Sequence, residues 1–301
     1  LAWNPSPEEA FDILAVGSWD GTLSFHKLNG RTVGRERQLD AVPTSLAYTR
    51  GGEFLLSAGS DRSVRLLTKE GAALGTLVEA DEWVWRARPR LAHSATAPGL
   101  RVAVADAAGK VGVWAVHFGT VHALYRDRYA FRDLMTDVVV QHLTTEQRVR
   151  IRCKQLVHKV ALFRGVLAVQ LKDSINVYRL TDAAAPTDMQ YKPAQRIKGA
   201  HECSSLVATQ RHLVLCRGRR LVALGAGGKR EREWELDAPV RFVKAVGGAA
   251  GAEGLLVGLK DGQVLQVFLD NPFPVQLLEG GTGVKCVDLS LDKTRLAVVD
   301  E

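Results

Sequence analysis

The chain has 301 residues, a hydrophobic fraction of 46% and a formal net charge of +7. No stretch approaches the run of about 20 apolar residues that spans a bilayer, so we expect a protein that is not transmembrane. The length suits one large domain or two medium ones. The four cysteines have no CxxC pair, which argues against a disulfide framework or a structural zinc site. They are Cys153, Cys203, Cys216 and Cys286.

One pattern recurs along the chain: a short apolar strand, a polar tight turn and a second apolar strand. Its copies are separated by 41, 47, 65, 46, 42 and 41 residues. A repeat of this length indicates a modular fold, and it must be recognised before any single element is interpreted. The copies begin at Ile13, Phe54, Arg101, Val166, His212, Gly254 and Arg295.

A turn residue stands seven positions after the start of each of the first six copies. In four copies it is an aspartate, and twice a glycine follows it, which favours a hairpin because glycine tolerates positive φ. The aspartates recur once per repeat, so turn formation explains them better than a metal cluster does. The residues assigned to these turns are Asp20, Gly21, Asp61, Asp173, Asp261 and Gly262.

A further strand precedes each copy, as in 44–49, and a more variable fourth strand fits the remaining residues, as in 71–77. Four short strands every 40 to 47 residues is the period of a propeller blade. The best helix candidate, 129–137, is short. A β-sandwich also has many short strands, but it does not repeat at a fixed period. The predicted fold is therefore all-β, with WD40-type β-propeller blades.

The 65-residue interval between Arg101 and Val166 breaks the period. It contains an aromatic and charged stretch, 120–133, which we interpret as the passage from one propeller to the next. Propellers close with about four to eight blades, because closure protects the sheet edges. Two arrangements remain open at this point: one ring with a large insertion, or two rings that are each represented in part.

No motif in the sequence assembles catalytic chemistry. The chain has no glycine-rich phosphate loop ending in Lys-Ser/Thr, no GxSxG elbow and no HExxH. His201 and Cys203 have no identifiable orienting partner, so a loop that enters a strand explains them more simply. Trp83 and Trp85 share one face of a strand, where packing in the core or between blades is expected. We predict no catalytic, cofactor-binding or metal-binding residues.

Basic residues are spread along the chain, with one dense run, 148–154, that alternates arginine and apolar residues. The alternation predicts a strand with one charged face and one buried face. A solvated sheet face explains this run better than a dedicated anion site. The basic charge nevertheless keeps one alternative function open, a propeller module that binds phosphoinositide or nucleic acid.

One stretch, 120–157, reads TVHALYRDRYAFRDLMTDVVVQHLTTEQRVRIRCKQLV. It closely resembles the intraflagellar transport protein 122 family, WD-repeat subunits of intraflagellar transport complex A. The family also carries an acidic insertion after its Trp-Asn-Pro strand, where this sequence has only 6–10 before Phe11. The likeness covers essentially the whole chain and continues through 11–25, 79–89, 231–248, 253–265 and 296–301.

The resemblance implies two tandem propellers. Residues 1–118 would be the C-terminal blades of the first, 119–137 the connection, and 138–301 the N-terminal blades of an incomplete second. The resemblance also implies a non-enzymatic scaffold in retrograde ciliary transport and in the entry of ciliary membrane proteins. Expected partners are other complex A subunits and, indirectly, complex B trains, the dynein motor and ciliary membrane cargo, with no specific nucleic acid. Expected locations are the cilium or flagellum, the basal body and the cytoplasm.

Aromatic side chains in the predicted connection are too apolar to remain in water along a bare linker. Neighbouring charges of both signs suit a polar rim around an aromatic centre. We therefore expect this segment to contact a partner or to fix the angle between the two propellers. The residues assigned to this contact are Tyr125, Arg126, Arg128, Tyr129, Phe131 and Arg132.

Overall fold

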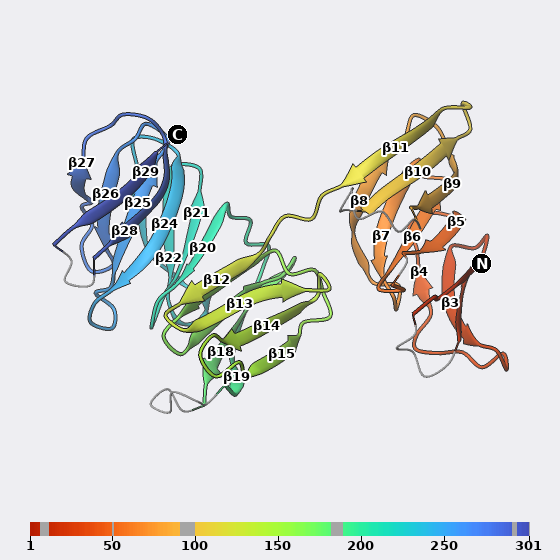
Figure 1. The fold of residues 1–301 in the computed structure, drawn as a ribbon, viewed down its shortest axis with the longest axis horizontal. Coiled ribbons are helices and arrows are strands. Elements are labelled where there is room, and N and C mark those ends of the chain that lie inside the picture. The colour runs from red at the N-terminus through yellow and green to blue at the C-terminus, as the bar shows by residue number, and fades with distance from the viewer. Residues whose placement is uncertain (7–11, 50, 91–99, 182–188, 291–293, 301) are drawn as a thin grey trace. The chain divides into compact units, whose positions relative to one another are not determined.

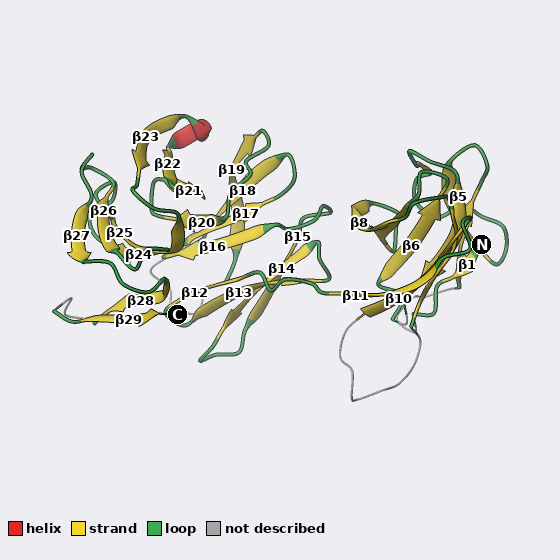
Figure 2. Ribbon diagram, turned by 90° about the horizontal axis from the view of Figure 1, so that it is seen from above, coloured by secondary structure: helices red, strands yellow, loops and turns green. Residues whose placement is uncertain are grey.

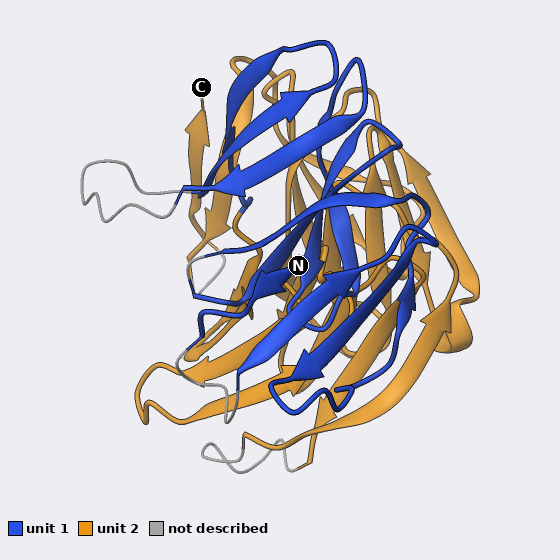
Figure 3. Cartoon of the chain, turned by 90° about the vertical axis from the view of Figure 1, so that its right-hand side faces the viewer, with its two compact units in different colours: residues 1–119 blue, residues 120–301 orange. Residues whose placement is uncertain are grey.

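The computed structural model describes residues 1–6, 12–49, 51–90, 100–181, 189–290 and 294–300. Most of the short segment where the family carries its acidic insertion lies outside these residues. The chain divides into two compact units, residues 1–119 (unit 1) and 120–301 (unit 2), which Figure 3 distinguishes by colour. Within the described residues, no helix is both long enough and apolar enough to cross a membrane.

Unit 1 contains three antiparallel sheets, whose strands follow one another in chain order (Figure 1). The first sheet is β1 (Ala2–Trp3), β2 (Ile13–Gly17), β3 (Thr22–Lys27) and β4 (Arg37–Gln38). The second is β5 (Pro43–Tyr48), β6 (Phe54–Gly59), β7 (Ser63–Thr68) and β8 (Ala73–Glu79). The third has three strands, β9 (Val84–Pro89), β10 (Leu100–Asp106) and β11 (Val111–Val116).

Unit 2 contains four four-stranded sheets and one strand pair, again in chain order (Figure 2). The first sheet is β12 (His122–Tyr125), β13 (Arg128–Asp133), β14 (Asp137–His142) and β15 (Arg148–Arg152). The second is β16 (Lys159–Phe163), β17 (Val166–Gln170), β18 (Ser174–Leu180) and β19 (Tyr191–Lys198). The third is β20 (Ser205–Ala208), β21 (Leu213–Arg217), β22 (Arg220–Leu224) and β23 (Arg230–Glu235), with a 3₁₀ turn, η1 (Ala226–Gly228), before its last strand. The fourth is β24 (Val240–Gly247), β25 (Gly254–Leu259), β26 (Val264–Phe268) and β27 (Val275–Leu278), and the pair is β28 (Val284–Leu289) and β29 (Leu296–Asp300).

The first strand of each sheet contacts the first strand of the next. In unit 2 this order is β12, β16, β20, β24 and β28, and in unit 1 it is β1, β5 and β9. The apolar cores lie between neighbouring sheets, as where Phe163 and Val166 pack with Leu213 and Leu215. The second strand of a sheet that lies between two others is therefore covered on both faces. This is why β17 and β25 are buried along their whole length. These are the blades of β-propellers, as the repeat predicted.

Residues 119–137 do not form a connection separate from the blades, and residues 129–137 do not form a helix. Both predictions are wrong. Residues 122–125 and 128–133 are β12 and β13, which pair in register with each other and with β14. The long interval therefore contains an unrecognised copy of the repeat, whose second strand begins at Arg128. Its turns escaped notice because non-glycine residues take the positive φ: 53° at Arg126, 45° at Leu134 and 64° at Met135.

Other expectations for individual strands had mixed outcomes. Residues 148–152 form β15 and alternate exposed arginines with half-buried apolar residues, as predicted. Trp83 and Trp85 are not in a core, because their side chains are 43% and 52% exposed, and their ring centroids lie 6.4 Å apart. Trp85 lies in β9 and Trp83 directly precedes it, in the last sheet of unit 1. Within unit 1, this sheet packs against another sheet on one of its faces only.

Candidate functional site

The turns between the first and second strands of the four complete sheets in unit 2 lie close together. We call them the first turns; they are residues 126–127, 164–165, 209–212 and 248–253. Hydrogen bonds connect the last three, and Arg128, which directly follows the first of them, bonds to the second, although up to 84 residues separate the bonded groups in sequence. The sheets follow one another side by side, so turns that join the same two strands of each sheet meet at one end of the blades.

Arg164 is the centre of this network. Its Nη1 donates to Oε1 of Gln210 at 2.6 Å, and its Nη2 donates to the carbonyl oxygen of Gly248 at 3.0 Å. Its own carbonyl oxygen accepts a bond of 3.4 Å from Nη1 of Arg128. Arg179 Nη2 donates to the carbonyl oxygen of Gln210 at 3.1 Å. Arg164 adopts a φ of 50°, and a side chain with several donors stabilises this unfavourable backbone conformation.

A buried carboxylate connects the third and fourth first turns. Glu253 is 0% exposed. Its Oε1 accepts the backbone N–H of Gln210 at 3.0 Å, and its Oε2 accepts the backbone N–H of Gly251 at 2.7 Å. Charge-assisted hydrogen bonds of this kind are about twice as strong as neutral ones. The two bonds therefore compensate for the free-energy cost of burying the carboxylate. The carboxylate thus holds two neighbouring blades in a fixed relation.

Three of the first turns, 126–127, 164–165 and 209–212, contribute to a cavity of about 780 Å³, which we call the arginine cavity. Among the described residues that line it, the cations are all arginines and Asp127 is the single acidic residue. Val166 and Leu180, which are 4% and 7% exposed, contribute apolar surface. The residues that line the cavity are Tyr125, Arg126, Asp127, Arg128, Arg164, Gly165, Val166, Arg179, Leu180 and Gln210.

Three of the six predicted contact residues line the arginine cavity: Tyr125, Arg126 and Arg128. Tyr125 packs edge-on against Phe163 with ring centroids 5.0 Å apart, and the guanidinium of Arg126 lies 5.7 Å from the centre of the Tyr125 ring. Tyr125 therefore packs against two cores, the one between the first and second sheets of unit 2 and the one between the second and third.

The other three predicted contact residues lie outside the cavity. Tyr129 and Phe131 stack on each other with centroids 5.5 Å apart. Arg132 Nη1 donates to the carbonyl oxygen of Val157 at 2.9 Å, and burial lowers the pKa of Arg132. A contact between propellers through these residues stays a prediction.

The predicted turn residues lie between second and third strands, at the opposite end of the blades from the first turns. Asp20 Oδ1 accepts the N–H of Thr22 at 2.9 Å, and Asp261 Oδ1 accepts the N–H of Gln263 at 3.1 Å. Gly21 and Gly262 have φ of 83° and 88°. Asp61 bonds to Ser63 and to Nη2 of Arg65, and Asp173 follows β17.

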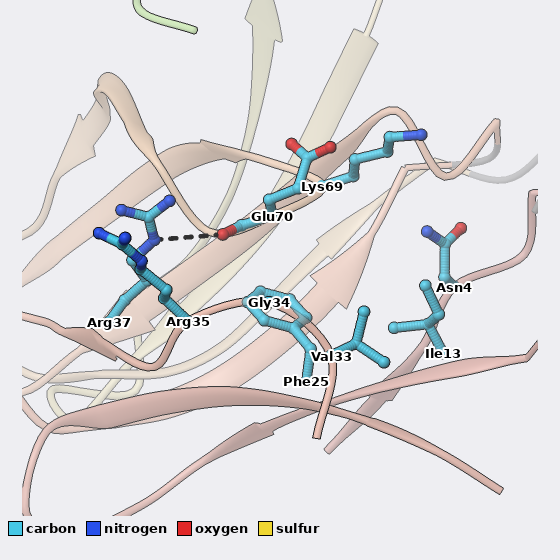
Figure 4. A pocket seen from close by; sticks show the side chains of 9 residues that line it. All are labelled: Asn4, Ile13, Phe25, Val33, Gly34, Arg35, Arg37, Lys69 and Glu70. Atoms are coloured by element: carbon cyan, nitrogen blue, oxygen red, sulfur yellow. Dashed lines mark hydrogen bonds between the residues drawn. The ribbon is translucent and has the colours of Figure 1, made fainter. Parts of the chain in front are cut away.

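Unit 1 has a smaller hollow of about 380 Å³ between its first two sheets (Figure 4). Ile13, Phe25 and Val33 provide its apolar surface. Figure 4 shows Arg35 and Arg37 side by side, and Nε of Arg37 donates to the carbonyl oxygen of Glu70 at 3.4 Å. The hollow combines cationic and apolar groups, but its charged residues are exposed. The remaining lining residues are Asn4, Gly34 and Lys69.

The cysteine and histidine singled out in the sequence do not form a nucleophilic pair. Cys203 Sγ donates to Oε1 of Gln170 at 3.2 Å, and burial raises the pKa of the Cys203 thiol to about 11. His201 Nε2 lies 3.3 Å from the carbonyl oxygen of Lys198 instead. A thiol with a raised pKa stays protonated and unreactive near neutral pH. Among the described residues, no group of three or more His, Cys, Asp or Glu is placed to hold a metal ion.

Sequence reasoning missed Arg164, Arg179, Gln210 and Glu253. Arg179 lies in β18 and the other three lie in first turns, and their mutual contacts depend on how the blades follow one another. One signal was available, because Arg164-Gly165 and Arg126-Asp127 both separate two apolar strands by two residues. Alignment of the repeats on these first turns would have placed the arginines together.

Comparison with known proteins gives consistent similarities. A family model described as IFT122 second beta-propeller matches residues 122–301. Intraflagellar transport protein 122 homologues from Mus musculus and Danio rerio are 45% and 44% identical over 100% of the chain, and the one from Homo sapiens is 45% identical over 98%. The chain spans about a quarter of the length of these relatives, namely 25%, 25% and 23%.

Among solved structures, one described as BBS1N in complex with ARL6DN, soaked with lead, aligns with a TM-score of 0.42 and 12% identity. The alignment covers 97% of this chain and 85% of that chain. A similarity at this level carries no argument about function.

Proposed function

We propose a scaffolding function for this chain, which belongs to the intraflagellar transport protein 122 family. In this proposal it is a non-enzymatic part of a subunit of intraflagellar transport complex A. Its blades hold other proteins on their faces and edges. The observation that carries the proposal is 45% identity to a curated family member over the whole chain.

The division into blades supports the same proposal. The family model begins at residue 122, and unit 2 begins at residue 120. We therefore assign unit 2 to the N-terminal blades of a second propeller and unit 1 to the C-terminal blades of a first one. The network of Arg164 and Glu253 supports a rigid role for unit 2, since it joins loops that would otherwise move separately.

The proposed partners are other complex A subunits and, indirectly, complex B trains, the dynein motor and ciliary membrane cargo. The proposed process is retrograde transport in the cilium or flagellum together with entry of ciliary membrane proteins, with additional pools at the basal body and in the cytoplasm. The motor supplies the chemical work, and this chain supplies rigid binding surfaces.

Nonspecific binding of phosphoinositide or nucleic acid by the basic strand β15 is disfavoured. The guanidinium of Arg150 is 2.6 Å from Oδ2 of Asp133 and 3.1 Å from Oδ2 of Asp137. These carboxylates raise the pKa of Arg150 and neutralise the centre of the strand's charged face. An anion at β15 would have to compete with both aspartates.

The proposal is tested by depletion and rescue in ciliated cells. Removal of the intact protein should leave complex B trains accumulated at ciliary tips, and wild-type protein should restore their return. A version of the protein that lacks unit 2 should fail to rescue. Normal return of trains in depleted cells would contradict a role in retrograde transport.

A further inference from the structure

The arginine cavity has the size and chemistry of a binding site. Its volume of about 780 Å³ lies within the range of ligand pockets, roughly 300–1,000 Å³. Four arginines come from four different strands or turns, and they share the cavity with the ring of Tyr125 and the buried side chains of Val166 and Leu180. A cavity with convergent cations and apolar walls fits a ligand that carries both anionic and apolar groups.

The positive charge in this cavity is not balanced from within. In the described part of the chain, no carboxylate forms an ion pair with Arg126, Arg128, Arg164 or Arg179. The hydrogen bonds of the last three go to neutral oxygens. The one acidic lining residue, Asp127, is engaged elsewhere: its Oδ2 lies 2.9 Å from Nε2 of His142.

The orientation of that histidine follows from its other nitrogen. Nδ1 of His142 accepts the backbone N–H of Thr145 at 3.2 Å, which fixes the ring with Nε2 2.9 Å from Oδ2 of Asp127, although Nε2 has no hydrogen-bond partner of good geometry. Asp127 lies beside His142 at the cavity, and within the described residues it forms no ion pair with the four guanidinium groups, whose charge is available for a ligand.

Arg128 provides a second, independent observation that favours an anionic ligand in the arginine cavity. The residue is only 9% exposed, its Nε has no hydrogen-bond partner, and its Nη1 makes one long bond of 3.4 Å. A buried cation with an unused donor is costly unless an acceptor reaches it. An anionic group that enters the cavity beside Arg128 removes this cost, so the residue favours the bound state.

We infer that the arginine cavity binds an acidic peptide segment of a partner protein through arginine–carboxylate contacts. The inference rests on the proposed scaffold function and names the chemistry of one partner. Arginine forms two parallel bonds with a planar carboxylate, which lysine cannot, and every cation in this cavity is an arginine. Apolar side chains of the segment pack on Tyr125, Val166 and Leu180. A lipid surface needs exposed charge, whereas Arg128 is buried.

The test uses the purified intact protein and a fluorescein-labelled peptide of alternating glutamate and leucine, measured by fluorescence anisotropy. A peptide with glutamine in place of glutamate is the matched ligand control. The cavity variant combines Arg126→Gln and Arg179→Gln, because both side chains are exposed. The control variant combines Arg148→Gln and Arg152→Gln, two exposed arginines of β15 with the same change in charge.

The glutamate peptide should bind saturably and the glutamine peptide should not. The cavity variant should weaken binding by about tenfold or more, because it removes two charge-assisted contacts, while the control variant stays within about twofold. Arg128→Gln should weaken binding as well, and the double variant serves as the test if this one fails to fold.

Three results would overturn the inference: no saturable binding, equal loss in the cavity and control variants, or binding to phosphatidylinositol bisphosphate vesicles without binding to the peptide. The assay does not depend on assembly of complex A. Normal assembly without peptide binding therefore refutes only this inference, and peptide binding without assembly refutes only the scaffold.

Discussion

The buried carboxylate of Glu253 should be the strongest single link between the third and fourth first turns. The change to test is Glu253→Ala. It removes the acceptors of two backbone donors, the N–H of Gln210 at 3.0 Å and the N–H of Gly251 at 2.7 Å. A hydrogen bond to a charged group contributes about 1.5–3 kcal/mol, so both together amount to about 3–6 kcal/mol of local stability.

Amide hydrogen exchange of the intact protein measures this loss where it occurs. A loss of about 3 kcal/mol accelerates exchange by roughly 100-fold, and the acceleration should appear at the amides of Gln210 and Gly251. Glu253→Gln keeps one acceptor and should produce an intermediate effect. The matched control is Glu235→Gln, because Glu235 is exposed and lies 3.5 Å from Arg220, a surface pair that contributes about 0–1 kcal/mol.

Unchanged exchange at both amides in Glu253→Ala would refute the reasoning. It would mean that the two turns hold their positions without the carboxylate. Equal acceleration across all of unit 2, including strands far from residue 253, would instead assign the effect to global unfolding and not to the link between turns.

Three further outcomes follow from the structure. Gly262→Ala should destabilise unit 2 more than Gly247→Ala by about 1–3 kcal/mol, measured by hydrogen exchange. Both glycines have positive φ, but of the two only the Cβ at 262 would clash with backbone atoms, those of Gly281 and Thr282. Equal effects would contradict the clash. Replacing Leu134–Met135 by Asn-Gly should stabilise the β13–β14 hairpin by about 1–2 kcal/mol, since asparagine and glycine accept the positive φ of that turn. The hairpin amides should then exchange more slowly with solvent, and faster exchange would disprove the prediction. Iodoacetamide at pH 8 should label Cys203 on the order of 100-fold more slowly than an ordinary thiol, because the Cys203 pKa of about 11 leaves little thiolate. The labelling rate should rise as the pH is raised toward 11. Cys286 is exposed and should label first, and early labelling of Cys203 would refute the raised pKa.

The sequence predicted the blades where turn chemistry was explicit. Asp20-Gly21 and Asp261-Gly262 marked hairpins because glycine is the residue that takes positive φ most easily. The same reasoning failed at Arg126 and at 134–135, where the surrounding pairs of strands impose a left-handed conformation on ordinary residues. Tertiary pairing outweighed local preference there, so the first two strands of a blade, β12 and β13, were interpreted as part of a connection.

The arginine cavity could be predicted only in part. Tyr125, Arg126 and Arg128 were selected from the sequence for their chemistry, but the expected setting was a linker and not a blade. Arg164 and Glu253 were not selected, because their importance arises from contacts across 46 and 43 residues. Such contacts depend on the order of the blades, which local sequence patterns do not encode.

The central claim is that this chain is a scaffold within intraflagellar transport complex A. The most direct test is the protein composition of the complex that purifies with it. The intact tagged protein should be purified from ciliated cells under native conditions, and its partners should be quantified by mass spectrometry. The account predicts recovery of the other complex A subunits in equimolar amounts, with cross-links to residues of units 1 and 2. Recovery of the protein alone, at the mass of a monomer, would contradict it.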